Sequence, residues 1–195
     1  MKLGLHAGCI MNTNVVTDIR IAQETGYDAI ELWITKLRRY LDNGFTAEEL
    51  VPKLGNLSVT MLNCVLHVEK QDPGFRKELI ADFERLCHAA GKLNCGALQM
   101  IVLDSLKGME WPEQRRLIAA SLAELADIAK QHGLKLAVEP VVFSPFNTIR
   151  QFLEVHEEAA RDNISIVVDT WHIWTAGVPW EDVAALDSGL IHGAH

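Results

Sequence analysis

Three apolar runs of the sequence end in side chains that commonly bind divalent cations. Glu139 closes one run, Asp169 closes the next, and His195 closes the last. Two carboxylates and an imidazole are suitable ligands for Mn²⁺, Mg²⁺, Co²⁺ or Zn²⁺. An ion bound by them could polarise a carbonyl and hold two vicinal oxygens, while a neighbouring carboxylate removes an α-proton. These residue types therefore indicate proton transfer next to a carbonyl, through an enediolate.

Each of these residues also has an ordinary structural explanation. Glu139 could be solvated or paired, Asp169 could cap a turn, and His195 could be a packed histidine. A common site is the better interpretation, because the three residues end consecutive strands and neighbouring strands lie about 4.8 Å apart. His172 lies just beyond the strand end that carries Asp169, so we expect it beside the same site.

Five further residues are candidates for contact with a substrate, namely His6, Glu31, Trp33, His67 and Trp171. Glu31 is expected to face inward with Trp33, where it could orient a catalytic group or pair with a basic residue, since a buried carboxylate needs a partner. His6 faces inward on the first run, and His67 follows the third. Trp171 could form the wall of a sugar pocket, and loop packing is the equal alternative.

The elements that must position these residues alternate along the chain. Runs of strand character lie at 3–9, 29–33, 59–66, 97–103, 135–141, 164–171 and 190–195. Helical periodicity or helix-start signals are found at 14–25 and from residues 46, 73, 112, 147 and 179. Strands that alternate with helices predict βαβ units and a parallel sheet. An open doubly wound sheet and a (β/α)8 barrel are both consistent with this order.

The strand ends favour the barrel. A dinucleotide-binding sheet should show G-x-G-x-x-G after its first strand, but residues 8–12 read GCIMN, and the chain has no phosphate loop of the Walker type. In a barrel, alternate residues face inward and chemistry lies at the carboxyl ends of the strands. Alternation places Glu139, Asp169 and His195 inward, and it places His192 towards the helices. We therefore predict an α/β protein with a (β/α)8 TIM barrel.

Composition limits the classes of protein that remain. The 195 residues carry 18 basic and 26 acidic side chains, and the net charge of −8 argues against a nucleic-acid partner. No apolar run approaches the ~20 residues of a membrane span, and the start of the chain lacks the apolar stretch of a signal peptide. The four cysteines form no CxxC pair. We expect reduced thiols without a catalytic role, and a cytoplasmic protein that binds neither nucleic acid nor membranes.

The chain resembles the xylose-isomerase-like TIM-barrel superfamily along its whole length. The segments that carry the resemblance are GYDAIEL at 26–32, LAVEP at 136–140, VDTWH at 168–172 and GAH at 193–195. The nearest branch is the sugar phosphate isomerase/epimerase group, which includes ketose 3-epimerases and inosose isomerases or dehydratases. The resemblance implies that Glu139, Asp169 and His195 bind a divalent metal, which members take as Mn²⁺, Mg²⁺, Co²⁺ or Zn²⁺. It also implies that Glu139 is an acid/base carboxylate and that His172 binds a substrate oxygen near the metal.

The family pattern includes two features beyond these. A Glu on strand eight is the fourth ligand and the second acid/base carboxylate, and an Arg shortly after the strand-seven His often binds the substrate. Neither position exists in these 195 residues. Because a (β/α)8 barrel typically needs about 250 residues, we expect one domain, 1–195, that lacks strand eight and the last helices. Such a chain is expected to bind metal weakly and to catalyse poorly.

The resulting hypothesis is a metal-dependent isomerase or epimerase that acts on a sugar or cyclitol. An inosose-type dehydratase that uses the same enolate is the nearest alternative. A non-catalytic binding protein on a degenerate barrel is another, because open edges on strands one and seven invite pairing, and a homo-oligomer could cover them. An apurinic-site endonuclease is disfavoured, because its trinuclear zinc cluster needs further histidines. The end of strand four offers none, and His67 is the only candidate on strand three.

Overall fold

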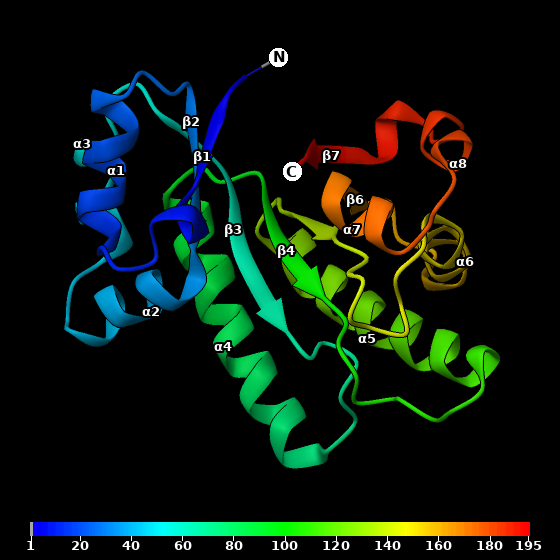
Figure 1. The fold of residues 1–195 in the computed structure, drawn as a ribbon. Helices are drawn as coiled ribbons and strands as arrows, with labels where there is room; N and C mark the ends of the chain where they lie inside the picture. Colours follow the sequence, from blue (N-terminus) through cyan, green and yellow to red (C-terminus); the bar gives the residue numbers. More distant parts are fainter. Residues whose placement is uncertain (1) are drawn as a thin grey trace.

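Seven parallel strands, hydrogen-bonded in chain order, form a curved sheet in the computed structural model, which describes residues 2–195 (Figure 1). The strands are β1 (Gly4–His6), β2 (Ala29–Trp33), β3 (Ser58–Leu66), β4 (Ala97–Ile101), β5 (Lys135–Val138), β6 (Ile164–Val168) and β7 (Ile191–Ala194). Each strand pairs in parallel with the next one along the chain. This is the strand order of a TIM barrel, so the predicted fold class is confirmed, with seven of the eight strands in these residues.

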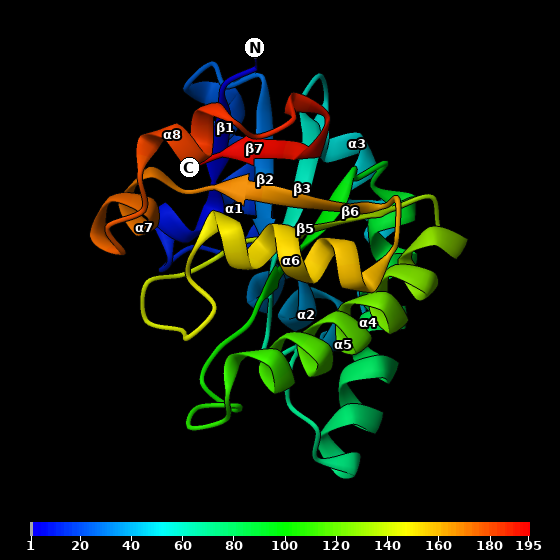
Figure 2. The same cartoon turned by 90° about the vertical axis from the view of Figure 1, so that its right-hand side faces the viewer.

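Helices connect the strands and cover the outer face of the sheet (Figures 1 and 2). The longer ones are α1 (Val15–Glu24), α2 (Ile34–Asp42), α4 (Pro73–Lys92), α5 (Trp111–Gln131) and α6 (Ile149–Ala159). The shorter ones are α3 (Val51–Leu54), α7 (Thr170–Thr175) and α8 (Trp180–Ala184), with 3-10 turns η1 (Ala7–Ile10), η2 (Ala47–Glu49) and η3 (Ser188–Leu190). Within residues 2–195, no helix combines the length and the apolar character that crossing a membrane requires.

Capping residues fix three of the six predicted helix starts. Asn14, Asp72 and Thr148 each accept a backbone N–H from the first turn of α1, α4 and α6, respectively.

Several predicted boundaries need correction. The first strand, predicted at 3–9, ends at His6, where the turn η1 begins, and β4 and β5 end at Ile101 and Val138 rather than at 103 and 141. The segment from residue 46 forms the short turn η2 followed by α3, although its capping box is present. The sixth strand ends at Val168, so the predicted extension to residue 171 is wrong, because Asp169 caps α7 there.

The sheet separates two apolar layers of unequal size. The inner layer, inside the barrel, is a small cluster made of Met61, Ala97, Ala137 and Val167. The outer layer is the main core, where residues such as Leu136 and Val138 pack with the helices. Ala137 therefore lies inside and its two neighbours lie outside, as strand alternation predicts. The same alternation places Glu139, which directly follows β5, on the inner side of the sheet.

His192 does not face the helix layer as alternation predicts. Its Nε2 lies 3.2 Å from the backbone oxygen of Thr60, which belongs to β3. Strands β7 and β3 are not neighbours in the sheet, so this contact crosses the barrel. The cause is an irregularity in register, because Ile166 pairs with Ile191 whereas Val167 pairs with Gly193. The extra residue on β7 is His192, and a β-bulge of this kind redirects a side chain.

Candidate active site

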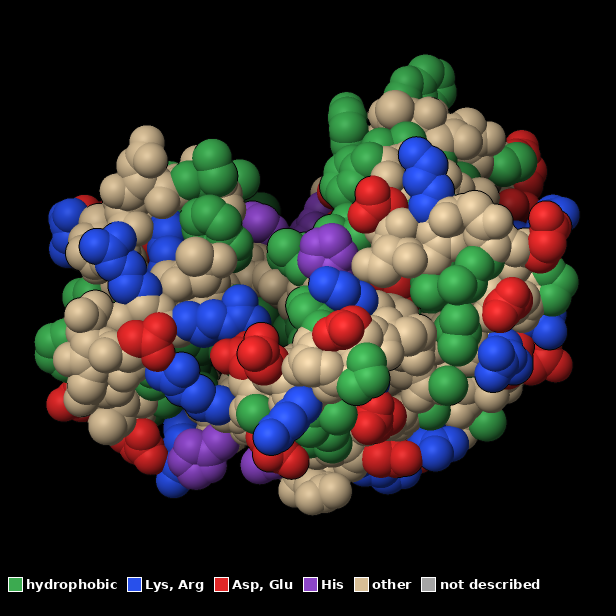
Figure 3. Space-filling model, turned by 90° about the horizontal axis from the view of Figure 1, so that it is seen from below, with side chains coloured by type: hydrophobic (Ala, Val, Ile, Leu, Met, Phe, Trp, Pro, Cys, Tyr) green, Lys and Arg blue, Asp and Glu red, His purple; other side chains and the backbone are tan. Residues whose placement is uncertain are grey.

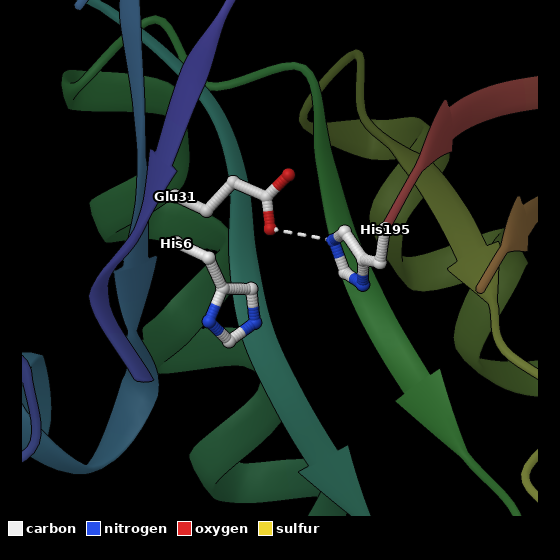
Figure 4. Close-up of side chains that lie close together, drawn as sticks. All are labelled: His6, Glu31 and His195. Carbon is white, nitrogen blue, oxygen red and sulfur yellow. Dashed lines mark hydrogen bonds and ion pairs between the residues drawn. The ribbon is translucent and has the colours of Figure 1, made fainter. Parts of the chain in front are cut away.

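The imidazole of His195 lies at the centre of the polar residues that enter the barrel. His6, Glu31 and His195 come from β1, β2 and the end of β7, and their ligating atoms lie within 4.8 Å of one another (Figure 4). Nε2 of His195 lies 3.0 Å from Oε2 of Glu31. The predicted inward direction of Glu31 is therefore confirmed. Residues from opposite ends of the chain meet at the carboxyl ends of the strands.

A second group of ligating side chains adjoins the first. Glu139, Asp169 and His172 follow β5 and β6, and their ligating atoms also lie within 4.8 Å of one another. Nδ1 of His195 lies 3.1 Å from Oε1 of Glu139, so the His195 ring joins the two groups. Viewed from the carboxyl ends of the strands, the surface is hollowed between two lobes, and histidine side chains lie on the walls of this notch (Figure 3).

Backbone pairing brings the end of β7 beside Asp169. The N–H of His195 donates to the oxygen of Val168 at 3.0 Å, and the N–H of Thr170 donates to the oxygen of His195 at 3.0 Å. These two bonds flank Asp169 on the chain. Asp169 and His195 are therefore neighbours on adjoining strands, although Asp169 also caps α7 by accepting the N–H of His172 at 2.8 Å.

The charges of this centre stabilise a protonated His195 ring. Burial lowers the pKa of His195, but its bonds to Glu139 and Glu31 outweigh burial and raise the pKa to about 10. Burial raises the pKa of Glu31, and the contacts with His195, His6 and Asn63 outweigh it, so the pKa of Glu31 is held below its ordinary value. In the protein without a bound ion, an imidazolium therefore lies between two carboxylates.

Two buried amides hold these carboxylates in place, and the sequence analysis did not give either amide this role. Nε2 of Gln99 donates to Oε2 of Glu139 at 2.9 Å, and Nδ2 of Asn63 donates to Oε2 of Glu31 at 3.2 Å. Both amide side chains belong to buried residues on β4 and β3. The sequence pattern that could have indicated this role is the inward position of each amide, because β4 adjoins the strand that ends at Glu139 and β3 adjoins the strand that carries Glu31.

Two histidines are arranged as hydrogen-bond donors rather than as metal ligands. Nδ1 of His172 accepts the backbone N–H of Val142 at 3.2 Å, and Nδ1 of His6 accepts that of Gly8 at 3.1 Å. A ring nitrogen that accepts an N–H carries no proton, so the proton of the neutral ring lies on Nε2. A metal-bound histidine has the opposite arrangement, with its free nitrogen donating to an acceptor.

The donor set that remains fits a divalent ion. Glu139, Asp169 and His195 supply carboxylate oxygens and an imidazole nitrogen from three adjoining strand ends, and the second ring nitrogen of His195 faces the carboxylate of Glu31. A carboxylate beside a ligating histidine is a common way to orient the ring. Mn²⁺, Mg²⁺, Co²⁺ and Zn²⁺ all accept such mixed oxygen and nitrogen ligands.

The other residues predicted to contact substrate lie at different distances from this centre. The ring of Trp171 makes an edge contact with His172, with ring centres 4.9 Å apart. Trp33 lines a groove of about 1180 Å³ together with residues 11–17 and the start of α2. His67 lies near Ser105 and Phe75. Within residues 2–195, His67 is not a member of either group of ligating side chains.

Comparisons with known proteins agree on one fold. A family model described as xylose isomerase-like TIM barrel matches residues 19–195. The inosose isomerase of Halalkalibacterium halodurans is 30% identical over 201 residues, which cover 100% of this chain and 71% of that protein. A crystal structure of the IOLI protein with a binding zinc atom aligns with a TM-score of 0.92 at 25% identity, over 100% of this chain and 72% of that one. D-psicose 3-epimerase in the presence of D-fructose has the same fold, with a TM-score of 0.84 at 17% identity over 100% and 72% of the two chains.

Proposed function

The chain belongs to the xylose isomerase-like TIM barrel family and is an enzyme, and we propose that it isomerises or epimerises a sugar or cyclitol with a bound divalent metal ion. The proposal is supported by three pairings at adjoining strand ends: Glu139 contacts His195, Glu139 and Asp169 share a group of ligating atoms, and the backbone of His195 pairs on both sides of Asp169. The similarity to the inosose isomerase of Halalkalibacterium halodurans supports a substrate that is a cyclic polyol carrying a carbonyl.

Glu139, Asp169 and His195 would hold the metal. When bound, such an ion polarises the substrate carbonyl and binds the adjacent hydroxyl oxygen. Asp169 keeps its cap on α7 in this arrangement, which ties it to the rigid end of β6. The three side chains come from strand ends that are fixed by backbone pairing, and such placement favours a defined site.

Glu139 would act as the base. It takes the proton from the carbon next to the substrate carbonyl, and the electron pair of that C–H bond moves towards the carbonyl oxygen to give an enediolate. Return of the proton to the former carbonyl carbon, with the hydroxyl proton of the α-carbon passing to the former carbonyl oxygen, would complete an isomerisation. Return of a proton to the opposite face of the α-carbon would complete an epimerisation. Gln99 holds one oxygen of Glu139, and Nε2–H of His172 is available to donate to a substrate oxygen.

The test combines removal of metal with one substitution. A chelator should abolish turnover of a panel of ketoses and inososes, and Mn²⁺, Mg²⁺, Co²⁺ or Zn²⁺ should restore it. Glu139→Gln should lower kcat by about 10²- to 10⁴-fold, which is the contribution of a positioned base. Exchange of the substrate α-proton with deuterated water, followed by NMR, measures the same step directly.

The matched control is Glu157→Gln, because Glu157 is an exposed glutamate on α6. This variant should keep the activity and the metal dependence of the wild type. Full activity of the metal-free protein, or unchanged α-proton exchange in Glu139→Gln, contradicts the proposal.

A further inference from the structure

His6 is held by the residue two positions after it. It precedes the turn η1, and its Nδ1 accepts the N–H of Gly8 at 3.1 Å. A Cβ added at Gly8 would lie 2.6 Å from Cε1 and 2.8 Å from Nδ1 of the ring. Gly8 lies in a 3-10 turn, whose backbone conformation suits any L-residue. Glycine is therefore needed at position 8 because the His6 ring occupies the space of a Cβ, and the backbone conformation does not require it.

This contact fixes the protonation of the ring. A backbone N–H is always a donor, so Nδ1 of His6 carries no proton and the neutral ring has its proton on Nε2.

Among the described residues 2–195, the Nε2–H group of His6 has no hydrogen-bond partner. The ring extends into the space that Glu31 and His195 also enter (Figure 4), and the ligating atoms of the three lie within 4.8 Å of one another. Across residues 2–195, however, no hydrogen bond is formed by Nε2 of His6 or by Oε1 of Glu31. The N–H of His6 is therefore a free donor in a polar space, and a hydroxyl or carbonyl oxygen can accept from it.

We propose that His6 donates its Nε2–H to a hydroxyl or carbonyl oxygen of the substrate and that Gly8 is the positioning residue that aims the ring. The inference rests on the proposed function, since the ligand class is the same polyol. His172 presents its own Nε2–H after β6, so two neutral imidazole donors enter the site from β1 and from α7.

The first measurement is the protonation state of the His6 ring. In ¹⁵N-labelled protein loaded with Zn²⁺, the ring nitrogens report the tautomer by NMR, and we expect His6 as the neutral Nε2–H form at pH 7.5. Addition of myo-inositol, used as a hydroxyl-bearing probe, should shift the Nε2 signal. A ring protonated on Nδ1, a charged ring, or a signal that does not respond to the probe overturns the inference.

The second measurement is a set of variants with a matched glycine control. Gly8→Ala and His6→Leu should each raise KM about five- to tenfold, which is the effect of losing one neutral hydrogen bond, with a smaller change in kcat. His6→Gln retains a side-chain N–H and should recover part of the loss. Gly4→Ala is the control on β1, because a Cβ there meets only ordinary contacts of 3.7 Å or more.

A double-mutant cycle distinguishes an effect of Gly8→Ala on the orientation of the His6 ring from an effect on the fold. With the ring removed in His6→Ala, the further change Gly8→Ala should leave KM unaltered, because the clash no longer exists. Equal effects of Gly8→Ala in both backgrounds overturn the inference. An inactive wild type contradicts the proposed function instead, and the role of His6 is then decided by the nitrogen spectrum and by binding of myo-inositol.

Discussion

At the scale of single residues, hydrogen bonds link an imidazole, two carboxylates and two amides at the centre of the barrel. His195 lies between Glu139 and Glu31, and each carboxylate receives one amide N–H from a neighbouring strand. Each carboxylate thus has one oxygen committed to a buried amide. The amides restrict how the carboxylates can turn, which matters for a base that must meet a particular C–H bond.

Gln99 is the residue through which this restriction can be tested. Gln99→Leu removes the donor to Glu139 in a buried position, so we expect kcat to fall by about tenfold at saturating metal and substrate, with a loss of stability of about 1–3 kcal/mol. Steady-state kinetics and urea unfolding measure the two effects. Gln131→Leu, at the exposed end of α5, is the control. A Gln99→Leu enzyme with the kcat of the wild type would show that the amide does not orient Glu139.

At the scale of elements, alternation and capping signals predict the strands and the capped helices well. They place the ends of β5, β6 and β7 together because parallel strands end at one edge. The helix α2 was not predicted, because it begins directly after β2 with Ile34-Thr35, which are weak helix formers, and Trp33 offers no capping oxygen. The register shifts between β2 and β3, between β3 and β4, and between β6 and β7 depend on three-dimensional pairing, so the direction of His192 could not be read from the sequence.

A buried ion pair that the sequence analysis also missed joins α2 to α1. Nζ of Lys36 lies 2.7 Å from Oδ2 of Asp18, and it donates to the backbone oxygens of Ala7 and Ile10 at 3.2 and 2.8 Å. Ala7 and Ile10 are the two ends of η1. Lys36 therefore secures the turn that follows His6, and it does so from the helix that follows Glu31.

Lys36→Met should destabilise the protein by about 3–5 kcal/mol, because it leaves the fully buried carboxylate of Asp18 without its partner. Chemical unfolding monitored by tryptophan fluorescence measures this change. The double variant Lys36→Met with Asp18→Leu should recover much of the loss. Arg20→Met is the control, because it breaks an exposed pair whose removal costs about 0–1 kcal/mol. Equal effects of the Lys36 and Arg20 substitutions would contradict a structural role for the buried pair.

At the scale of the whole molecule, contacts across the barrel join β7 to the first half of the sheet. Strands β1 and β7 are the two edges of the seven-stranded order. Near the carboxyl ends of the strands, His195 reaches Glu31 of β2, and further back His192 reaches Thr60 of β3. The two side chains differ in charge, because burial lowers the pKa of His192, whereas the carboxylates around His195 raise its pKa despite burial.

Burial of the His192 ring predicts a loss of stability in mild acid. The Thr60 oxygen can only accept, so Nε2 of His192 donates, and this bond acts against burial by raising the pKa of the ring. The ordinary pKa of the ring is 6.5, and burial lowers the pKa in the folded protein. The unfolded chain therefore takes up a proton near pH 6.5 that the folded protein resists. This contribution to stability is complete above that pH and is lost progressively as the pH falls below it.

Unfolding free energies in the presence of a chelator, measured between pH 7.5 and 5.5, should show this loss. His192→Gln keeps a side-chain N–H for Thr60 but cannot titrate, so its stability should fall less steeply over the same interval. His132→Gln removes an exposed histidine and should retain the slope of the wild type. Because His6 and the carboxylates are present in all three proteins, the difference in slope isolates His192. Identical slopes for the wild type and His192→Gln would contradict this contribution of the buried His192 ring to stability.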